Sequence, residues 1–179
     1  MTEQNRYSAD NERLYYSESR EDRSALPYTH LDHYLRAIWL ECCGHLSQFF
    51  LEKWGDKIAM NRRAGQIFGP GMELFYVYDF GTSSELGIQV VSSRTGKPLS
   101  PHPIILLARN DQPEEQCIEC EEPAAWLCLE CIYEYNVSGA LCDKHAKDHP
   151  HDEYGDPIPL VNSPRVGMCG YTGPAIPPY

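Results

Sequence analysis

The sequence lacks several features that would assign it to a familiar class of protein. No apolar run approaches the roughly 18 residues of a membrane-spanning helix, so a transmembrane protein is not expected. The first residues also lack the apolar core and small-residue cleavage pattern of a secretion signal. We therefore expect a cytoplasmic protein, in a reducing compartment where clustered cysteines are more often metal ligands than disulfides.

Basic side chains are scarce. The chain has 15 Lys and Arg residues against 26 Asp and Glu residues, a formal net charge of −11. The imbalance is strongest in residues 117–179, which contain 10 acidic and 3 basic side chains. An acidic surface repels a phosphate backbone, so nucleic-acid binding is disfavoured. A basic or amphipathic protein is a better match for this charge.

The motifs of common catalytic sites are also missing. The sequence contains no glycine-rich phosphate loop, no Gly-x-Ser-x-Gly elbow and no His-Glu-x-x-His pair. Asp79 is expected to stabilise a turn rather than act as a base, and His45 to be a structural histidine. Glu85 and Cys169 complete the set of best catalytic candidates, but no base lies beside Cys169 in the sequence. Catalysis is therefore unsupported, and whether the protein is an enzyme stays open.

Cysteine and histidine, by contrast, are concentrated in one stretch. Residues 117–151 contain five of the eight cysteines and three of the seven histidines. Two Cys-x2-Cys pairs are followed by a Cys-x2-His pair and two more histidines. Two thiolates at one tight turn can reach the same Zn²⁺, and repeated pairs distinguish this pattern from a single redox motif. The candidate ligands are Cys117, Cys120, Cys128, Cys131, Cys142, His145, His149 and His151.

The order of these ligands resembles that of the B-box zinc finger, in which the pairs interleave. In that family the first and third pairs hold one metal, and the second and fourth hold another. The resemblance implies one site of Cys117, Cys120, Cys142 and His145, and a second of Cys128, Cys131, His149 and His151. The ten residues between Cys131 and Cys142 exceed the usual spacing, and Cys169 is an alternative ligand for the second site. A single zinc held by the four knuckle cysteines also stays open.

We expect two Zn²⁺ ions with a structural role, because four protein ligands leave no open position for water or substrate. The stretch has few apolar residues, so the metal would supply much of its folding free energy. We therefore predict a zinc-binding adaptor that acts through contacts with other proteins, and a homo-oligomer stays open. The alternative is a hydrolase or nucleic-acid-processing factor with a site between the domains, near Asp79 and His45.

The remainder of the chain predicts a small α+β domain. Residues 1–28 are polar and charge-mixed, which indicates a flexible or loosely docked arm. Apolar residues then recur at helical spacing over about residues 30–43, with Thr29 as the N-cap. On this helix Cys42 and Cys43 are expected to be small buried hydrophobic residues.

Four runs rich in aromatic and aliphatic residues predict strands. The first contains His-Leu-Ser-Gln-Phe, and the second contains Tyr-Val-Tyr-Asp-Phe-Gly and begins an antiparallel hairpin. An acidic linker over residues 111–115 leads to the zinc-binding stretch, and a Pro- and Gly-rich tail over residues 152–179 is expected to lie extended on the body. The predicted strands are residues 45–51, 72–81, 86–92 and 103–108.

The two quoted motifs, in this order, resemble those of the plasmid pRiA4b ORF-3-like domain. The resemblance covers about residues 29–108. It implies an α+β fold in which one main helix packs on a small, twisted, mainly antiparallel sheet, and it implies no activity. The expected organisation is an arm (1–28), an α+β domain (29–110), a zinc-binding module (117–151) and an extended tail (152–179).

Overall fold

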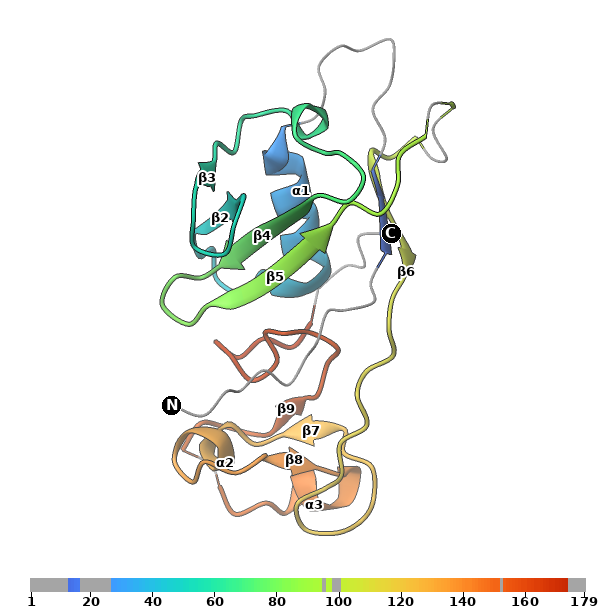
Figure 1. The fold of residues 1–179 in the computed structure, drawn as a ribbon. Helices are drawn as coiled ribbons and strands as arrows, with labels where there is room; N and C mark the ends of the chain where they lie inside the picture. Colours follow the sequence, from blue (N-terminus) through green and yellow to red (C-terminus); the bar gives the residue numbers. More distant parts are fainter. Residues whose placement is uncertain (1–12, 17–26, 95, 98–100, 152, 174–179) are drawn as a thin grey trace.

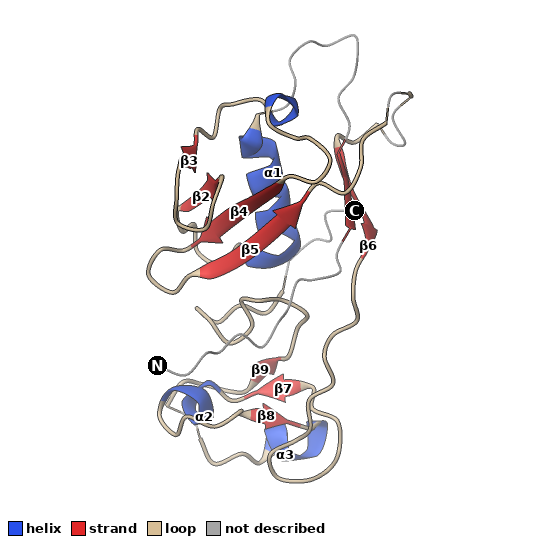
Figure 2. Cartoon of the chain, in the orientation of Figure 1, coloured by secondary structure: helices blue, strands red, loops and turns tan. Residues whose placement is uncertain are grey.

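A computed structural model describes residues 13–16, 27–94, 96–97, 101–151 and 153–173. Over these residues the chain is α+β, with small antiparallel sheets and few helices (Figures 1 and 2). An α+β unit lies in the upper part of Figure 1, and the cysteine-rich module lies below it. Most of the expected arm over residues 1–28 falls outside the described residues. No helix in the described part of the chain is long and apolar enough to cross a membrane.

The largest sheet has four antiparallel strands in the order β3-β2-β4-β5. Strand β4 is buried along most of its length. Its buried side chains are those of Leu74, Tyr76, Val77 and Tyr78. Its register with β5 pairs Tyr78 with Ser84, the first residue of that strand, so residues 79–83 connect the two strands. The strands are β2 (Ser47–Phe50), β3 (Lys57–Ile58), β4 (Glu73–Tyr78) and β5 (Ser84–Gln89).

One helical segment packs on this sheet and forms the main hydrophobic core. It consists of α1 (Tyr28–Leu35), continued by a π-helical turn, η1 (Arg36–Leu40). The ring of Phe49 lies between those of Tyr28 and Tyr76, with centroids 4.9 and 4.6 Å away. Leu35 and Ile38 are buried in the same core. A 3₁₀ turn, η2 (Ala64–Gln66), connects β3 to β4.

The predicted helix over residues 30–43 is wrong at both ends. It begins two residues earlier, after Pro27, because the N–H groups of Tyr28 and Thr29 donate to carbonyls of the β3–η2 loop rather than to a side-chain cap. It ends at Leu40, where Glu41 becomes extended after a last i→i−5 hydrogen bond. Cys42 and Cys43 therefore lie in the loop after the helix, and Cys43 is exposed rather than buried.

A separate two-stranded sheet lies beside the α+β unit. It pairs β1 (Arg13–Tyr16) with β6 (Ile104–Ala108) in antiparallel fashion. The strand predicted over residues 103–108 therefore exists, but among the described residues it pairs with the N-terminal segment and not with the hairpin. Sequence patterns cannot fix this pairing, because the two strands are far apart in the chain.

The cysteine-rich module contains three two-residue strands and two short helices. The strand order is β8-β7-β9, with all pairs antiparallel. Strand β9 comes from the predicted tail, so the tail completes the sheet of the module. The elements are β7 (Trp126–Leu127), α2 (Leu129–Tyr133), β8 (Ala140–Leu141), α3 (Asp143–Lys147) and β9 (Ile158–Pro159).

Beyond β9 the tail contacts the α+β unit. The hydroxyl of Ser163 donates to the carbonyl of Trp39 at 2.6 Å, so it satisfies a carbonyl near the end of the helical segment. Arg165 is fully buried, and Leu160 and Tyr171 are buried as well. The side-chain amide of Asn162 donates to the carbonyl of Asn110, in the connection between β6 and the module. Residues 174–179 of the expected tail lie outside the described residues.

Candidate metal centres

The first cluster of candidate ligands joins a loop to α3. Cys117 and Cys120 lie in the loop before β7, Cys142 precedes α3, and His145 lies within that helix. The Nδ1 atom of His145 is 3.4 Å from the Sγ atoms of Cys117 and Cys142, and 3.5 Å from that of Cys120. These are the four residues that the sequence groups in the first site.

The second cluster joins α2 to the residues after α3. Cys128 is the N-cap of α2 and Cys131 lies within it. The Sγ atom of Cys131 is 3.2 Å from Nε2 of His149 and 3.2 Å from Nδ1 of His151. The two imidazoles reach the same point through different ring nitrogens, although only Pro150 separates them. The structure thus also brings together the four residues grouped in the second site.

The spacing of these atoms fits a tetrahedral metal. Bonds of about 2.3 Å from Zn²⁺ to sulfur and about 2.0–2.1 Å to nitrogen put ligand atoms about 3.3–3.8 Å apart. The Sγ atoms of Cys120 and Cys142 are 3.9 Å apart, and the Sγ atom of Cys128 is 3.8 Å from Nδ1 of His151. All cysteines are free thiols. Both clusters are therefore compatible with zinc, in the interleaved arrangement.

The thiols of the module differ in how readily they ionise. Burial opposes ionisation of Cys117, but hydrogen bonds from the backbone of Cys142 and Glu119 outweigh it and lower its pKa to about 6. Burial and the neighbouring thiol of Cys128 instead raise the pKa of Cys131 to about 12. Metal ligation requires the thiolate, so binding at the second cluster would release a proton from Cys131.

The close approach of β8 to α2 depends on a glycine. Gly139 adopts a positive φ of 70°, and a Cβ at this position would lie 2.5 Å from the carbonyl oxygen of Cys128. The Gly139 carbonyl in turn accepts a 2.8 Å hydrogen bond from the N–H of Cys128. The ten residues that separate Cys131 from Cys142 form the end of α2, this turn and β8. The long spacing thus contains an element of the module's sheet and leaves the two clusters intact.

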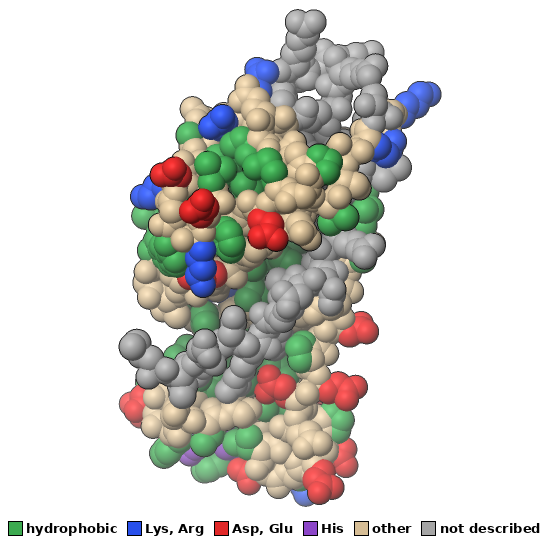
Figure 3. All heavy atoms as spheres, in the orientation of Figure 1, with side chains coloured by type: hydrophobic (Ala, Val, Ile, Leu, Met, Phe, Trp, Pro, Cys, Tyr) green, Lys and Arg blue, Asp and Glu red, His purple; other side chains and the backbone are tan. Residues whose placement is uncertain are grey.

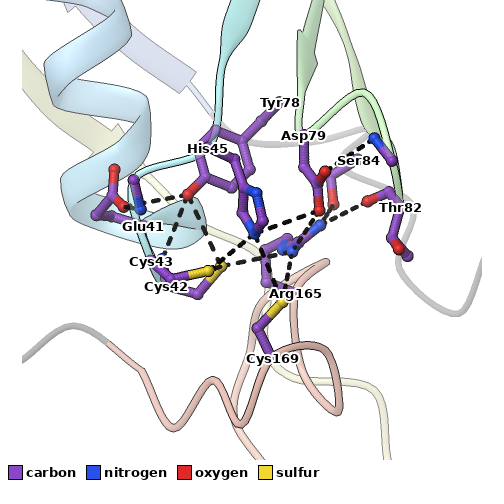
Figure 4. A network of polar contacts seen from close by, with 12 residues as sticks. Glu41, Cys42, Cys43, His45, Tyr78, Asp79, Thr82, Ser84, Arg165 and Cys169 are labelled. Carbon is purple, nitrogen blue, oxygen red and sulfur yellow. Dashed lines mark hydrogen bonds and ion pairs between the residues drawn. The ribbon is translucent and has the colours of Figure 1, made fainter.

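The structure also contains a third cluster of Cys and His residues, which the sequence did not predict. It contains Cys42, Cys43, His45 and Cys169, whose ligand atoms all lie within 4.8 Å of one another (Figure 4). The expectation of two buried cysteines on a helix is wrong, because neither residue is helical and Cys43 is exposed, although Cys42 is partly buried against the core. The alternative that Cys169 joins the second site is wrong too. Cys42 and Cys43 belong to an irregular loop, and Cys169 comes from the tail. Only the short Cys-Cys-Gly-His spacing could have indicated this cluster, because its fourth member is 124 residues away from His45.

Three of the four catalytic candidates, His45, Asp79 and Cys169, lie in or beside this third cluster. His45 Nε2 is 3.5 Å from Oδ2 of Asp79. Asp79 Oδ1 accepts a 2.9 Å hydrogen bond from the N–H of Gly81, as expected of a turn residue. Glu85 lies elsewhere on the hairpin, where its carboxylate contacts Lys53 at 2.7 Å and accepts from the indole of Trp54. Glu85 is therefore not part of the cluster.

Comparison of this chain with protein-family models, with curated proteins and with solved structures finds no match. The resemblances to the B-box zinc finger and to the plasmid pRiA4b ORF-3-like domain stay predictions from short motifs. The functional argument therefore rests on the geometry of the clusters and the surface around them.

Proposed function

We propose that the module of residues 117–159 is folded around two structural Zn²⁺ ions and acts as a protein-interaction adaptor. Each cluster in it offers four ligands, which leaves a tetrahedral metal no position for substrate. The buried cluster around the two sites consists of four ligand cysteines and Leu141, and the module has only a few other buried apolar residues, such as Leu127 and Ala140. A metal is therefore the natural source of its stability.

The observation that carries the adaptor role is the contact between a surface tyrosine and a ligand. The ring of Tyr135 stacks on that of His151, with centroids 4.7 Å apart and an interplanar angle of 11°. Tyr133, two residues before Tyr135, forms a second ring contact with Tyr154, with centroids 5.8 Å apart. All three rings are about half exposed: 50% for Tyr133, 57% for Tyr135 and 43% for Tyr154. We call these three residues the tyrosine surface.

The charge around the tyrosine surface indicates the chemistry of its partner. The exposed Glu134 accepts a hydrogen bond from the hydroxyl of Tyr154, and the exposed Glu153 is next to Tyr154 in the sequence. On the face shown in Figure 3, acidic side chains are spread over the module and Lys and Arg are few there. Exposed aromatic rings with surrounding carboxylates suit a basic, amphipathic peptide segment. Because Tyr135 packs on a metal ligand, binding should require the metal.

The test combines peptide selection with metal removal. A displayed library of random peptides is selected on the zinc-loaded full chain, and the affinity of enriched peptides is measured by fluorescence anisotropy. We expect peptides rich in Lys, Arg and apolar residues, at least about tenfold weaker binding to Tyr135→Ala, and loss of binding after chelation. Phe80→Ala, an exposed aromatic of the α+β unit, is the matched control and should bind normally. Equal binding to both variants, or binding that survives chelation, would overturn the adaptor role.

A further inference from the structure

We propose that Cys42, Cys43, His45 and Cys169 form a third zinc site, which joins the tail to the α+β unit. Three thiols and one imidazole nitrogen converge in this cluster, the same kinds of ligand as in the first cluster of the module. With it, the three clusters account for all eight cysteines of the chain. The site lies outside the module and does not depend on the adaptor role.

The distances suit a shared metal. The Sγ atoms of Cys42 and Cys43 are 3.7 Å apart, and Cys169 Sγ is 3.5 Å from Nε2 of His45. Both values are close to the edges of a tetrahedron around Zn²⁺, about 3.6–3.8 Å for bonds of about 2.1–2.3 Å. Cys43 Sγ is closer to Nε2, at 2.9 Å, so this edge would lengthen on binding. Thiolates and imidazole are the ligands that Zn²⁺ prefers.

A cysteine–histidine catalytic pair fits the same residues less well. Such a pair needs the thiol at one imidazole nitrogen and the orienting carboxylate at the other. Here Cys43, Cys169 and Asp79 all approach Nε2 of His45, at 2.9, 3.5 and 3.5 Å. One nitrogen cannot serve as both the base toward a thiol and the donor toward a carboxylate. Convergence of several groups on one nitrogen is instead what a metal between them produces.

The loop that carries three of the ligands is held by its own hydrogen bonds. The guanidinium of Arg36 donates to the carbonyl of His45 at 2.7 Å and to the hydroxyl of Ser47 at 2.9 Å. The carboxylate of Glu41 accepts from the N–H of Gly44, whose positive φ of 76° turns the chain between the ligands. Arg36 also pairs with Glu41 at 2.7 Å. The ligand loop is thus fixed by contacts that do not involve the ligand side chains.

The guanidinium of Arg165 donates hydrogen bonds to two of the sulfur atoms from the interior of the protein. It is fully buried, and its Nη2 atom lies 3.4 Å from Sγ of Cys42 and 3.6 Å from Sγ of Cys169 (Figure 4). Three thiolates and one Zn²⁺ carry a net charge of about −1, which a neighbouring guanidinium compensates. Outer hydrogen bonds of this kind orient metal ligands and are a regular part of such sites.

Such a site would join two segments that are far apart in the sequence through one metal. His45 precedes β2 of the α+β unit, whereas Cys169 follows β9 of the module, 124 residues later. Cys43 and Cys169 are exposed, unlike the four buried cysteines among the ligands of the module. We therefore expect the third zinc to be the first that a chelator removes.

Metal stoichiometry of the natively purified full chain, measured by native mass spectrometry and elemental analysis, tests the site. We expect three zincs in the wild type, two in His45→Asn and two in Cys169→Ser. The matched control is His30→Asn, an exposed histidine outside all three clusters, which should keep three. Far-UV circular dichroism checks that each variant is folded.

A second measurement is independent of the variants. Zinc-loaded wild-type protein is alkylated under native conditions, and the modified cysteines are mapped by mass spectrometry during stepwise chelation. We expect Cys42, Cys43 and Cys169 to be protected at first and to react before the five cysteines of the module. Two zincs with these three thiols reactive from the start, or a disulfide among them, would overturn the third site while leaving the module intact. If the module held no zinc before any chelator was added, the result would contradict the proposed function instead.

Discussion

The guanidinium of Arg165 donates a 3.0 Å hydrogen bond to the carboxylate of Asp79, 86 residues earlier in the chain. Both side chains are buried, and the same guanidinium donates to the carbonyl of Thr82 at 2.6 Å. One side chain of the tail therefore binds the β4–β5 turn through two acceptors. This contact places the tail against the hairpin and next to the third cluster.

The ion pair also bears on the alternative of a hydrolase with Asp79 as its base. Burial opposes ionisation of this carboxyl, but the backbone N–H groups of Gly81 and Thr82 and the guanidinium of Arg165 outweigh it and lower the pKa of Asp79. A carboxylate with a lowered pKa is a weak base. Asp79 is thus better suited to holding the turn and the tail together than to removing a proton from a substrate.

Asp79→Asn should destabilise the protein by about 3 kcal/mol, because it leaves the buried charge of Arg165 without its carboxylate. Asparagine keeps the shape and tolerates the positive φ of 64° at this position, so the lost charge dominates. Urea denaturation followed by tryptophan fluorescence measures the change. The matched control is Glu85→Gln on the same hairpin, whose exposed pair with Lys53 should contribute less than about 1 kcal/mol. Equal effects of the two variants would show that the Arg165 pair adds no stability.

Tyr76→Phe should cost about 1–2 kcal/mol. The Tyr76 hydroxyl is buried and donates to Asp32 Oδ1 at 2.6 Å, on the helix that covers the sheet. Its removal takes one donor from that carboxylate, which still accepts hydrogen bonds from Ser47 and Arg36. The thermal midpoint should fall for Tyr76→Phe and stay unchanged for Tyr135→Phe, where the ring is exposed. A similar midpoint for both variants would contradict a stabilising role of the buried hydroxyl.

Gly139→Ala should disrupt the second cluster. The added Cβ would lie 2.5 Å from the carbonyl oxygen of Cys128, so β8 and the N-terminus of α2 would have to move apart. We expect faster transfer of one zinc to a chromophoric chelator and a lower thermal midpoint. Gly155→Ala separates the clash from backbone strain, because Gly155 has a similar φ of 80° but open space around its Cβ position. The control should cost only about 1 kcal/mol. Equal zinc transfer rates in the two variants would show that close packing at Gly139 is unimportant.

The sequence predicted which Cys and His residues of the module cluster together, because the spacing of metal-binding pairs is a local constraint. Pairs such as Cys117 and Cys120 reach one metal only at short spacing, so their pattern is visible without any knowledge of the fold. The pairing of first with third and second with fourth came from a resemblance, and the structure groups the same residues.

The third cluster could not be predicted from the sequence, because Cys169 is far from the other members in the chain. Cys169 approaches His45 only because Arg165 and Ser163 fix the tail on the α+β unit, and no local pattern encodes contacts over more than 80 residues. The helix boundary added to the error. The apolar periodicity extends to Cys42, yet the helix ends at Leu40, so a residue on the predicted apolar face belongs instead to a ligand loop.

Removal of metal should unfold the module and leave the α+β unit folded. Four of the five buried residues in the cluster around the sites are ligand cysteines, and Leu127, Ala140 and Leu160 add only a small apolar core, so the apo module would have little to hold it together. The core of the α+β unit, by contrast, is built from aromatic and aliphatic side chains such as Tyr28, Phe49 and Leu74, none of which contacts a metal through a donor atom. Hydrogen exchange of the chelated chain should therefore show lost protection in β7 and β8 and retained protection in β2 and β4. Addition of Zn²⁺ should restore the protection of β7 and β8. Equal loss in both units would show that they fold as one cooperative body, in which the contacts of the tail, and not the metal alone, decide the stability of the module.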